Sequence, residues 1–432
     1  MKKILQTIVS LMVVASILAG CKANPTTMIT PTTTAATSMI VTTPVISTTE
    51  ATISTTTEVT TAITTTAATT PAATTPTTAA TTTASTTSTP VTTSPTEFYP
   101  TGGWRISDPA SQGVDASQLD ALMTYISTKN LAVDSVVVIR HGYFVYEKYP
   151  NVAYQQNTKH QIYSCSKSIL GAMIGIAIEE GYIHSLQDKM LDYFPDRTIA
   201  NLDSRKSNIT LENLMKMNAG MAFNEWALPY SDPNNAWIKA ITSPDPIQYI
   251  LDLPMAAEPG TVWNYCGGYT YLLSAILMKA TNMTLLEFTN KYLFVPMGIT
   301  DVRWDKNANV SKTIPNFYDA AGGLFLTPRD MAKFGYLILH NGIWNGVQLI
   351  PSGFVKDSTK VQSSFNYNSG YGYESWWTYQ AENMYYAAGI YGQKIFIVPS
   401  LDLVVVFTGT IYTDVDTYNH NFMTNYIIPA CK

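Results

Sequence analysis

A serine and a lysine stand one helical turn apart at the start of an apolar stretch. In QIYSCSKSILGAMIGIAIEEGYI (161–183), apolar residues recur at helical spacing from Ile169 to Ile178. Residues three apart share a face of a helix, so Ser164 and Lys167 would place a hydroxyl beside an amine. Such an amine can activate the hydroxyl when burial or nearby charge lowers its pKa. The pair favours nucleophilic catalysis by a serine, and the alternative for so short a motif is an exposed first turn of a helix.

Two later stretches contain a tyrosine in a loop and a glycine on a strand. In PGTVWNYCGGYTYLLSAIL (259–277), Tyr265 lies in a glycine-containing loop before an expected helix. In AAGIYGQKIFIVP (387–399), Gly389 lies on an expected strand. Taken in chain order with the serine and lysine pair, these residues resemble the S-x-x-K, Y-x-N and K-T-G motifs of the serine β-lactamase and penicillin-binding superfamily.

The chain resembles in particular the class C β-lactamase-related hydrolases of that superfamily. These include esterases, D-alanyl-D-alanine carboxypeptidases and 6-aminohexanoate-dimer hydrolases. The resemblance covers about 104–407 and includes three supporting segments, which are GYIHSLQDKMLDYFP (181–195), ITLENLMKMNAGM (209–221) and GGLFLTPRDMAKFG (322–335). It implies a serine hydrolase with a β-lactamase/transpeptidase-like fold.

The resemblance also implies a role for each motif residue. Ser164 would attack the substrate carbonyl and form an acyl-enzyme. Lys167 would either accept the proton of Ser164 or, as an ammonium, maintain the electrostatic field around it. Tyr265 would pass the proton to the leaving group, and a nearby ammonium would be needed to favour its phenolate. The backbone N–H groups of Ser164 and Ile390 would form the oxyanion hole. Which of Lys167 and Tyr265 is the base at acylation stays open at this point.

Three positions depart from the motifs of lactam-processing relatives. Gly267 stands in place of the Asn of Y-x-N, and Ala387 and Ala388 replace the Lys and Thr of K-T-G. The cation expected to meet a β-lactam carboxylate is thereby removed, and strand alternation leaves the direction of nearby Lys394 open. We therefore expect an ester or short linear amide as substrate, bound near Gly267 and Gly389.

Several aromatic residues are candidates for a substrate cleft. Trp226 and Trp377 are the two that we expect to contact an apolar substrate. The wider candidate group comprises Trp226, Tyr371, Tyr373, Trp376 and Trp377, for which packing in the core is the alternative. Tyr269 and Tyr271 fall where a helix should begin and are expected to be packing residues. No cofactor is expected, and neither metal-ligand spacing nor a Ser-His-Asp elbow appears in the sequence.

The pattern of elements predicts an α+β domain. Strand-like runs lie at 133–150 and at 384–409, and mostly helical sequence separates them. The expected helices include 168–180, 210–217, 271–281 and 328–341. We therefore predict one antiparallel sheet built from both ends of the domain, flanked by helices and interrupted by a mostly helical lobe. A net charge of -5 without charge blocks gives no basic surface for nucleic acid.

The first 97 residues predict export and a lipid anchor. Residues 1–20 read as a signal peptide, because two lysines precede a short apolar run. The sequence LAGC that ends at Cys21 resembles the lipobox of bacterial lipoproteins, and a plain secretory signal is the alternative. Residues 21–97 are rich in Thr, Ala and Pro, which predicts a disordered stalk. The domain at 98–432 is then expected outside a bacterial membrane, held to it by lipid on Cys21.

Three cysteines remain once Cys21 is assigned to lipid. Cys165 follows the candidate nucleophile, Cys266 follows the candidate tyrosine, and Cys431 is near the end. An odd number cannot pair fully within one chain, so we expect buried free thiols. A disulfide between Cys165 and Cys266 is the alternative.

Three functional hypotheses follow from the sequence. The first is a surface-anchored serine hydrolase acting on a small ester or amide. The second is a D-Ala-D-Ala carboxypeptidase or weak β-lactamase, which the departures at Gly267 and Ala387 disfavour. The third is a binding protein that keeps the fold without turnover. The presence together of Ser164, Lys167 and Tyr265 argues against the third hypothesis.

Overall fold

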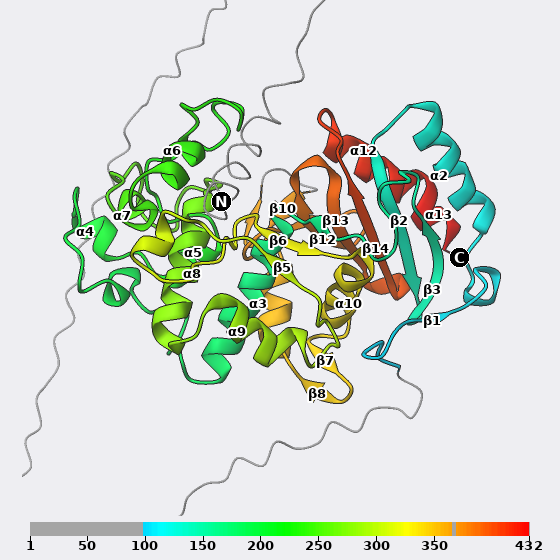
Figure 1. The fold of residues 1–432 in the computed structure, drawn as a ribbon, viewed down its shortest axis with the longest axis horizontal. Coiled ribbons are helices and arrows are strands. Elements are labelled where there is room, and N and C mark those ends of the chain that lie inside the picture. Colours follow the sequence, from blue (N-terminus) through cyan, green and yellow to red (C-terminus); the bar gives the residue numbers. More distant parts are fainter. Residues whose placement is uncertain (1–97, 365–368, 432) are drawn as a thin grey trace, which may run out of the picture. The chain divides into compact units, whose positions relative to one another are not determined.

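A nine-stranded sheet is built from both ends of the chain that the structure describes. The computed structural model describes residues 98–364 and 369–431. The strands lie in the order β1-β3-β2-β14-β13-β12-β11-β10-β9 (Figure 1). Neighbouring strands are antiparallel except for the edge pair β1 and β3, which is parallel. The α+β prediction of one sheet from both ends is confirmed, with a parallel pair at one edge that the sequence did not indicate.

The strands of the main sheet come from two parts of the chain. The first part supplies β1 (Arg105–Ile106), β2 (Val133–Arg140) and β3 (Tyr143–Lys148). The second supplies β9 (Ser363–Ser364), β10 (Ser369–Tyr371), β11 (Trp376–Tyr379), β12 (Met384–Gly389), β13 (Gln393–Val398) and β14 (Leu403–Gly409). Smaller sheets are formed by β4 (His160–Gln161), β6 (Leu324–Leu326) and β5 (Arg303–Trp304), and by β7 (Ile343–Trp344) with β8 (Val347–Gln348).

The central strands β2, β13 and β14 are buried throughout because both faces of the sheet are covered. In β2, Val136 and Val138 belong to one hydrophobic cluster, while Val137 and Ile139 belong to the other. Successive side chains of a strand point to opposite faces, so an unbroken run of valines serves two cores at once. The sheet therefore separates two layers of helices.

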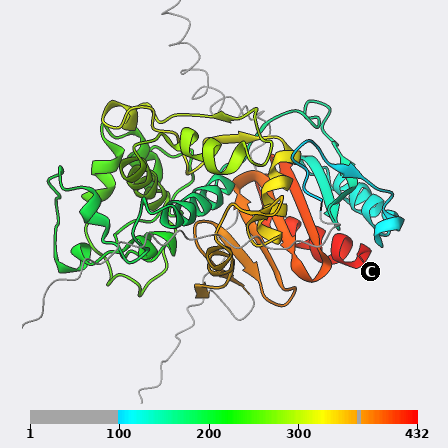
Figure 2. The ribbon, with the colours of Figure 1, turned by 90° about the horizontal axis from the view of Figure 1, so that it is seen from below.

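The helices divide between those layers and an inserted lobe (Figures 1 and 2). One face of the sheet carries α2, α12 and α13, and the other carries α3 and α10. The lobe contains the helices numbered between α3 and α10. The α-helices are α2 (Ala116–Thr128), α3 (Cys165–Glu179), α4 (Ser204–Ser207), α5 (Leu211–Met215), α6 (Ala236–Thr242), α7 (Pro246–Leu251), α8 (Gly267–Thr281), α9 (Leu285–Thr289), α10 (Pro328–Leu339), α11 (Ser352–Thr359), α12 (Val415–Phe422) and α13 (Ile428–Ala430).

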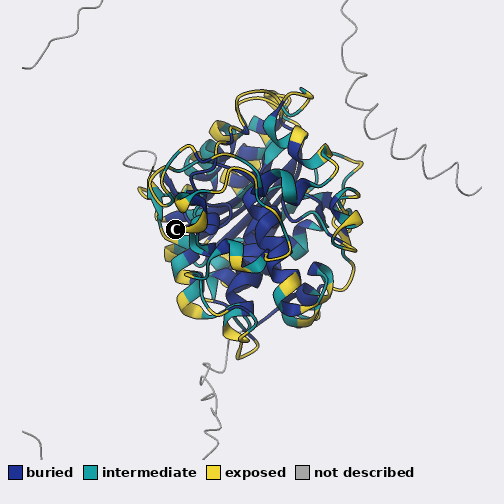
Figure 3. Cartoon of the chain, turned by 90° about the vertical axis from the view of Figure 1, so that its left-hand side faces the viewer, coloured by how far each residue is buried: buried dark blue, intermediate teal, exposed yellow. Residues whose placement is uncertain are grey.

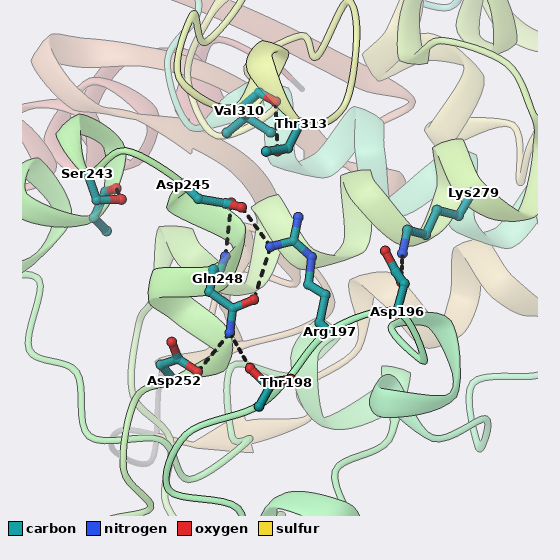
Figure 4. A network of polar contacts seen from close by, with 11 residues as sticks. Asp196, Arg197, Thr198, Ser243, Asp245, Gln248, Asp252, Lys279, Val310 and Thr313 are labelled. Carbon is teal, nitrogen blue, oxygen red and sulfur yellow. Dashed lines mark hydrogen bonds and ion pairs between the residues drawn. The ribbon is translucent and has the colours of Figure 1, made fainter.

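Polar side chains hold the periphery of the lobe together (Figure 4). Asp245 caps α7 by accepting from the backbone N–H of Gln248, and it also pairs with Arg197 at 2.7 Å. The side-chain amide of Gln248 then donates to the carbonyl of Thr198 and to Asp252. A cap of this kind typically contributes about 1 kcal/mol to stability. The network joins α7 to the segment that leads into the lobe.

The strands β9, β10 and β11 were not predicted from the sequence. There the chain turns through Glu374 and Ser375, both in the left-handed region with φ of 42° and 68°. Tyr371, Tyr373 and Trp376 are buried in the core and line neither of the two described cavities that contain Ser164. Seen from the side of the helical lobe, buried residues gather at the centre and exposed residues on the outer loops (Figure 3).

The predicted signal peptide, the stalk and Cys21 all lie outside the described residues. Within the described ranges, the structure contains no helix that is both long enough and apolar enough to cross a membrane.

Candidate active site

Ser164 lies at a sharp turn between β4 and α3. It precedes the first residue of α3, and its neighbour Tyr163 has φ of 47°, in the left-handed region. A non-glycine residue in that region costs roughly 1 to 2 kcal/mol, so the surrounding packing must hold the turn. The turn presents the Ser164 hydroxyl to two cavities.

Two donors from distant parts of the chain converge on that hydroxyl. Lys167 Nζ donates to Ser164 Oγ at 3.0 Å and to the carbonyl of Ala321 at 2.7 Å. Tyr265 OH donates to Ser164 Oγ at 2.9 Å, and Lys167 Nζ lies 5.3 Å from the centre of its ring. The structure thus brings together the three residues that the motifs indicated.

Burial has opposite consequences for the two donors. It lowers the pKa of Lys167, while the carboxylates of Glu225, Glu374 and Asp319 act to raise that pKa again. It raises the pKa of Tyr265 well above its usual value, and the charge of Glu225 acts in the same direction. Desolvation disfavours the charged form of either group. The environment therefore favours a neutral tyrosine beside a lysine that loses its proton more readily than usual.

Glu225 is a site residue that the sequence reasoning missed. Its side chain is buried, with Oε2 accepting from the N–H of Gly267 at 2.6 Å and Oε1 accepting from Tyr230 OH at 2.9 Å. Burial raises the pKa of Glu225, and the nearby Lys167 lowers it. A single glutamate in a loop is not part of a recognisable sequence motif, so only the contacts of Glu225 in the structure identify it as a site residue.

Gly267, which the sequence offered as a substrate contact, lies on neither of the two cavity walls beside Ser164. It is the buried first residue of α8, and its N–H is taken by Glu225. A Cβ at this position would lie 3.0 Å from the ring of Trp237. Close packing therefore accounts for the glycine, which lines neither cavity beside Ser164.

A second missed carboxyl, Glu374, lies fully buried below the site. Its Oε2 accepts from Thr270 Oγ1 at 2.9 Å, and burial raises its pKa to about 8. The next residue, Ser375, lines the larger cavity, and its N–H donates to Tyr371 OH at 2.6 Å. A hydrogen bond from the Ser375 side chain offsets part of the rise in the pKa of Tyr265.

Two cavities meet at Ser164 and Ile390. The larger, of about 350 Å³, also has Trp226, Trp377 and Gly389 on its wall, where the sequence placed substrate contacts. Trp226 stacks on the ring of Tyr265 with centroids 5.0 Å apart. The smaller, of about 190 Å³, is lined by Glu225, Asp319 and Lys167 among others. One side of Ser164 is thus largely aromatic, and the other is charged.

The end of β12 packs directly against the turn that precedes Ser164. A Cβ on Gly389 would lie only 2.4 Å from the carbonyl oxygen of Ile162. Only glycine permits this close approach, which brings Ile390 to the same two cavities as Ser164. The two backbone N–H groups expected to form an oxyanion hole therefore belong to adjoining segments.

The three described cysteines are free and buried, so the alternative of a Cys165–Cys266 disulfide is excluded. Burial raises the pKa of the Cys165 thiol to about 12. A thiolate at this position is therefore disfavoured at neutral pH. Across the described part of the chain, no group of three or more His, Cys, Asp or Glu residues is arranged to hold a metal ion.

Comparison with known proteins gives relatives over most of the domain. The chain is 25% identical over 360 residues to the 6-aminohexanoate-dimer hydrolase of Paenarthrobacter ureafaciens. The matched region covers 77% of this chain and 88% of that hydrolase. It is 29% identical over 178 residues to the lovastatin esterase of Penicillium rubens, covering 33% of this chain and 42% of the esterase.

A solved structure shares the fold. The octameric penicillin-binding protein homologue from Pyrococcus abyssi superimposes with a TM-score of 0.57 at 19% identity, over 72% of this chain and 77% of the homologue. Residues 119–419 match the family described as Beta-lactamase, which is well over half of the chain. The chain therefore belongs to the β-lactamase family and is a serine hydrolase of that superfamily.

Proposed function

We propose that the protein hydrolyses a small ester or short amide through an acyl-enzyme on Ser164. Lys167 takes the Ser164 proton as Oγ attacks the carbonyl, and the N–H groups of Ser164 and Ile390 hold the oxyanion. Tyr265 then gives its proton to the leaving group and recovers one from Lys167. Water then attacks the acyl-enzyme, and the protons move in the reverse order: from water to Tyr265, from Tyr265 to Lys167, and from Lys167 to Ser164 Oγ as the acyl group leaves. The observation that carries this proposal is the pair of hydrogen bonds, from Lys167 and Tyr265, on Ser164 Oγ.

The assignment of Lys167 as the base at acylation rests on the directions of the two pKa shifts. Burial moves the pKa of Lys167 toward neutral pH and that of Tyr265 away from it. A general base works best when its pKa lies near the working pH. Tyr265 is then suited to donate a proton, because its hydroxyl stays neutral.

The names of the relatives support the substrate class. One is a 6-aminohexanoate-dimer hydrolase and another a lovastatin esterase. Ala387 is fully buried and offers no cation on β12 for a β-lactam carboxylate. A cell-wall carboxypeptidase or weak β-lactamase, and a binding protein without turnover, are the competing functions that experiment must separate.

A serine-reactive fluorophosphonate probe followed by a substrate panel tests the proposal. We expect labelling at Ser164 in wild type and none in folded Ser164→Ala. We also expect turnover of 4-nitrophenyl esters that exceeds turnover of nitrocefin and of D-Ala-D-Ala peptides. If folded wild-type protein is not labelled by the probe and turns over none of the substrates, the protein is a binding protein without turnover. If it prefers nitrocefin to the esters, it is a β-lactamase.

We also propose that the hydrolase is exported and held at a bacterial membrane by lipid on Cys21. The support is the short apolar segment after Lys2 and Lys3, and the lipobox-like LAGC that ends at Cys21. The substrate would then be met outside the cytoplasm.

A further inference from the structure

A buried lysine faces the larger cavity from the strand beside β12. Lys394 of β13 pairs with Ala388 of β12 in the antiparallel register, so the two side chains share one face of the sheet. Lys394 is only 3% exposed, and both residues line the cavity that contains Ser164. The direction of Lys394, open from the sequence, is therefore toward the site.

Lys394 restores a cation where β12 has none. Ala387 and Ala388 stand where lactam-processing relatives carry Lys and Thr, and the neighbouring strand supplies the ammonium instead. Among the described residues that line this cavity, Lys394 is the single cation. The surrounding wall is largely aromatic, with Trp377, Tyr379 and Tyr386 in it. An ammonium in such surroundings interacts strongly with any anion that enters.

Asp416, the ion-pair partner of Lys394, can be replaced by another anion. Lys394 Nζ pairs with Asp416 Oδ1 at 2.6 Å and lies 5.3 Å from the centre of the Tyr386 ring. The Asp416 side chain is 69% exposed and comes from the first turn of α12. Asp416 can turn to water at little cost, whereas the buried ammonium must keep an anionic partner. Replacing one carboxylate by another leaves the ammonium paired throughout.

We propose that Lys394 binds a free carboxylate of the substrate, which displaces Asp416 from the ammonium. The preferred substrate is then an ester or short amide that also bears a carboxylate. This inference rests on the proposed hydrolase function and revises the expectation that loss of the K-T-G cation leaves no partner for a substrate carboxylate.

Matched ester pairs test the inference on the full chain. One pair is 4-nitrophenyl hexanoate and the 4-nitrophenyl monoester of adipic acid, with the carboxylate on the acyl part. The other is phenyl acetate and 4-carboxyphenyl acetate, with the carboxylate on the leaving group. The measured quantity is the kcat/KM ratio of the charged to the neutral ester, corrected for spontaneous hydrolysis.

In at least one pair, we expect Lys394→Met to lower this ratio at least about tenfold, mainly through KM, because a charge-assisted hydrogen bond is lost. Lys394→Arg should retain most of the ratio, and Asp416→Asn should raise it because the competing carboxylate is gone. Ratios that stay within about twofold of wild type in both pairs overturn the inference. If Lys394→Met does not fold, the direction of the Asp416→Asn effect decides, and an unchanged or lower ratio overturns it.

A binding measurement separates this inference from the proposed function. In the Ser164→Ala background, calorimetry compares monomethyl adipate with methyl hexanoate, so no turnover is needed. Tighter binding of monomethyl adipate that Lys394→Met abolishes supports the carboxylate site even if wild type hydrolyses none of the esters. Equal binding of the two esters overturns a carboxylate site for the acyl part of the substrate while leaving ester hydrolysis untouched.

Discussion

At the scale of single residues, the hydroxyl of Ser164 is controlled by charges placed around its two donors. Three carboxyl groups oppose the effect of burial on the pKa of Lys167: those of Glu225 and Glu374, which are buried, and that of Asp319, which is partly exposed. Their balance decides at which pH the lysine becomes a neutral base. Such groups act through Lys167 and are positioning residues for the proposed reaction.

The role of Tyr265 can be tested by removing one oxygen atom. Tyr265→Phe should lower kcat by roughly two to four powers of ten, because the proton donor to the leaving group is lost. The ring stays, with its stacking on Trp226, so the melting temperature should change little. Tyr269→Phe and Tyr271→Phe are the controls, since both residues lie inside α8. They should stay within about tenfold of wild type, which corresponds to roughly 1.4 kcal/mol in the barrier. Loss of turnover in Tyr269→Phe with retention in Tyr265→Phe would contradict the assignment.

The electrostatic role of Glu225 can be tested through the pH profile. Lys167 must be neutral to accept a proton, so kcat/KM should rise as the pH increases through the pKa of Lys167. Because burial lowers that pKa, the rising limb of the profile should lie below pH 10.5, the usual pKa of a lysine. Glu225 acts to raise that pKa, so Glu225→Gln should shift the rising limb to lower pH. The amide oxygen can still accept from the Gly267 N–H. Exposed Glu258→Gln is the matched control and should leave the limb in place. A limb unmoved by Glu225→Gln, or moved to higher pH, would contradict this role.

At the scale of elements, the site depends on two segments that touch without being neighbours in sequence. The turn before α3 supplies Ser164, and the end of β12 supplies Ile390. Gly389 lets these segments approach, since its missing side chain leaves room for the carbonyl of Ile162. The oxyanion hole that we propose exists only while this contact holds.

A methyl group at Gly389 should separate the two segments. Gly389→Ala should reduce kcat by roughly two to three powers of ten, the usual loss when one oxyanion donor is misplaced. Gly353→Ala is the control, because a Cβ there has no atom within 4 Å. Steady-state kinetics with a 4-nitrophenyl ester, together with melting temperatures, measures both variants. Full activity in a folded Gly389→Ala protein would show that Ile390 does not hold the oxyanion.

At the scale of the whole molecule, the first and last strands of the domain share one sheet. β14 lies between β13 and β2, although more than 260 residues separate β2 from β14 in the chain. The helical lobe is inserted between these strands. The start of α3, with Ser164 and Lys167, precedes the lobe, and the loop before α8, with Tyr265, lies within it. The active site therefore forms only when both ends of the domain have assembled.

The anchor is testable on the complete chain in a bacterial host. Cys21→Ala should move the protein from the membrane fraction to a soluble fraction or leave the signal uncleaved, because the acylated residue is lost. Fractionation and mass determination of the N-terminus measure this, with Cys431→Ala as the control that keeps Cys21. A processed Cys21→Ala protein that still partitions to membranes would contradict lipid attachment at this residue.

Much of the fold and part of the site followed from local patterns. Residues three apart on a helix share a face whatever surrounds them, so Ser164 and Lys167 could be paired from sequence alone. The strands at 133–148 and 384–409 were evident for a similar reason, because unbroken apolar runs bounded by turns indicate buried strands. The strands β9, β10 and β11 were not predicted, because glycine and polar residues interrupt the alternation of apolar residues in that part of the sequence.

The remaining site residues were decided by tertiary structure. Glu225 and Glu374 affect the pKa of Lys167 from loops whose paths depend on tertiary packing, and no spacing in the chain encodes that proximity. Gly267 reads as a motif departure in sequence, yet the ring of Trp237 and the carboxylate of Glu225 account for it. Lys394 faces the cavity because the tight turn at Ile390–Gly392 sets the register of β12 and β13. A shift of one residue in that register would point the lysine to the opposite face of the sheet.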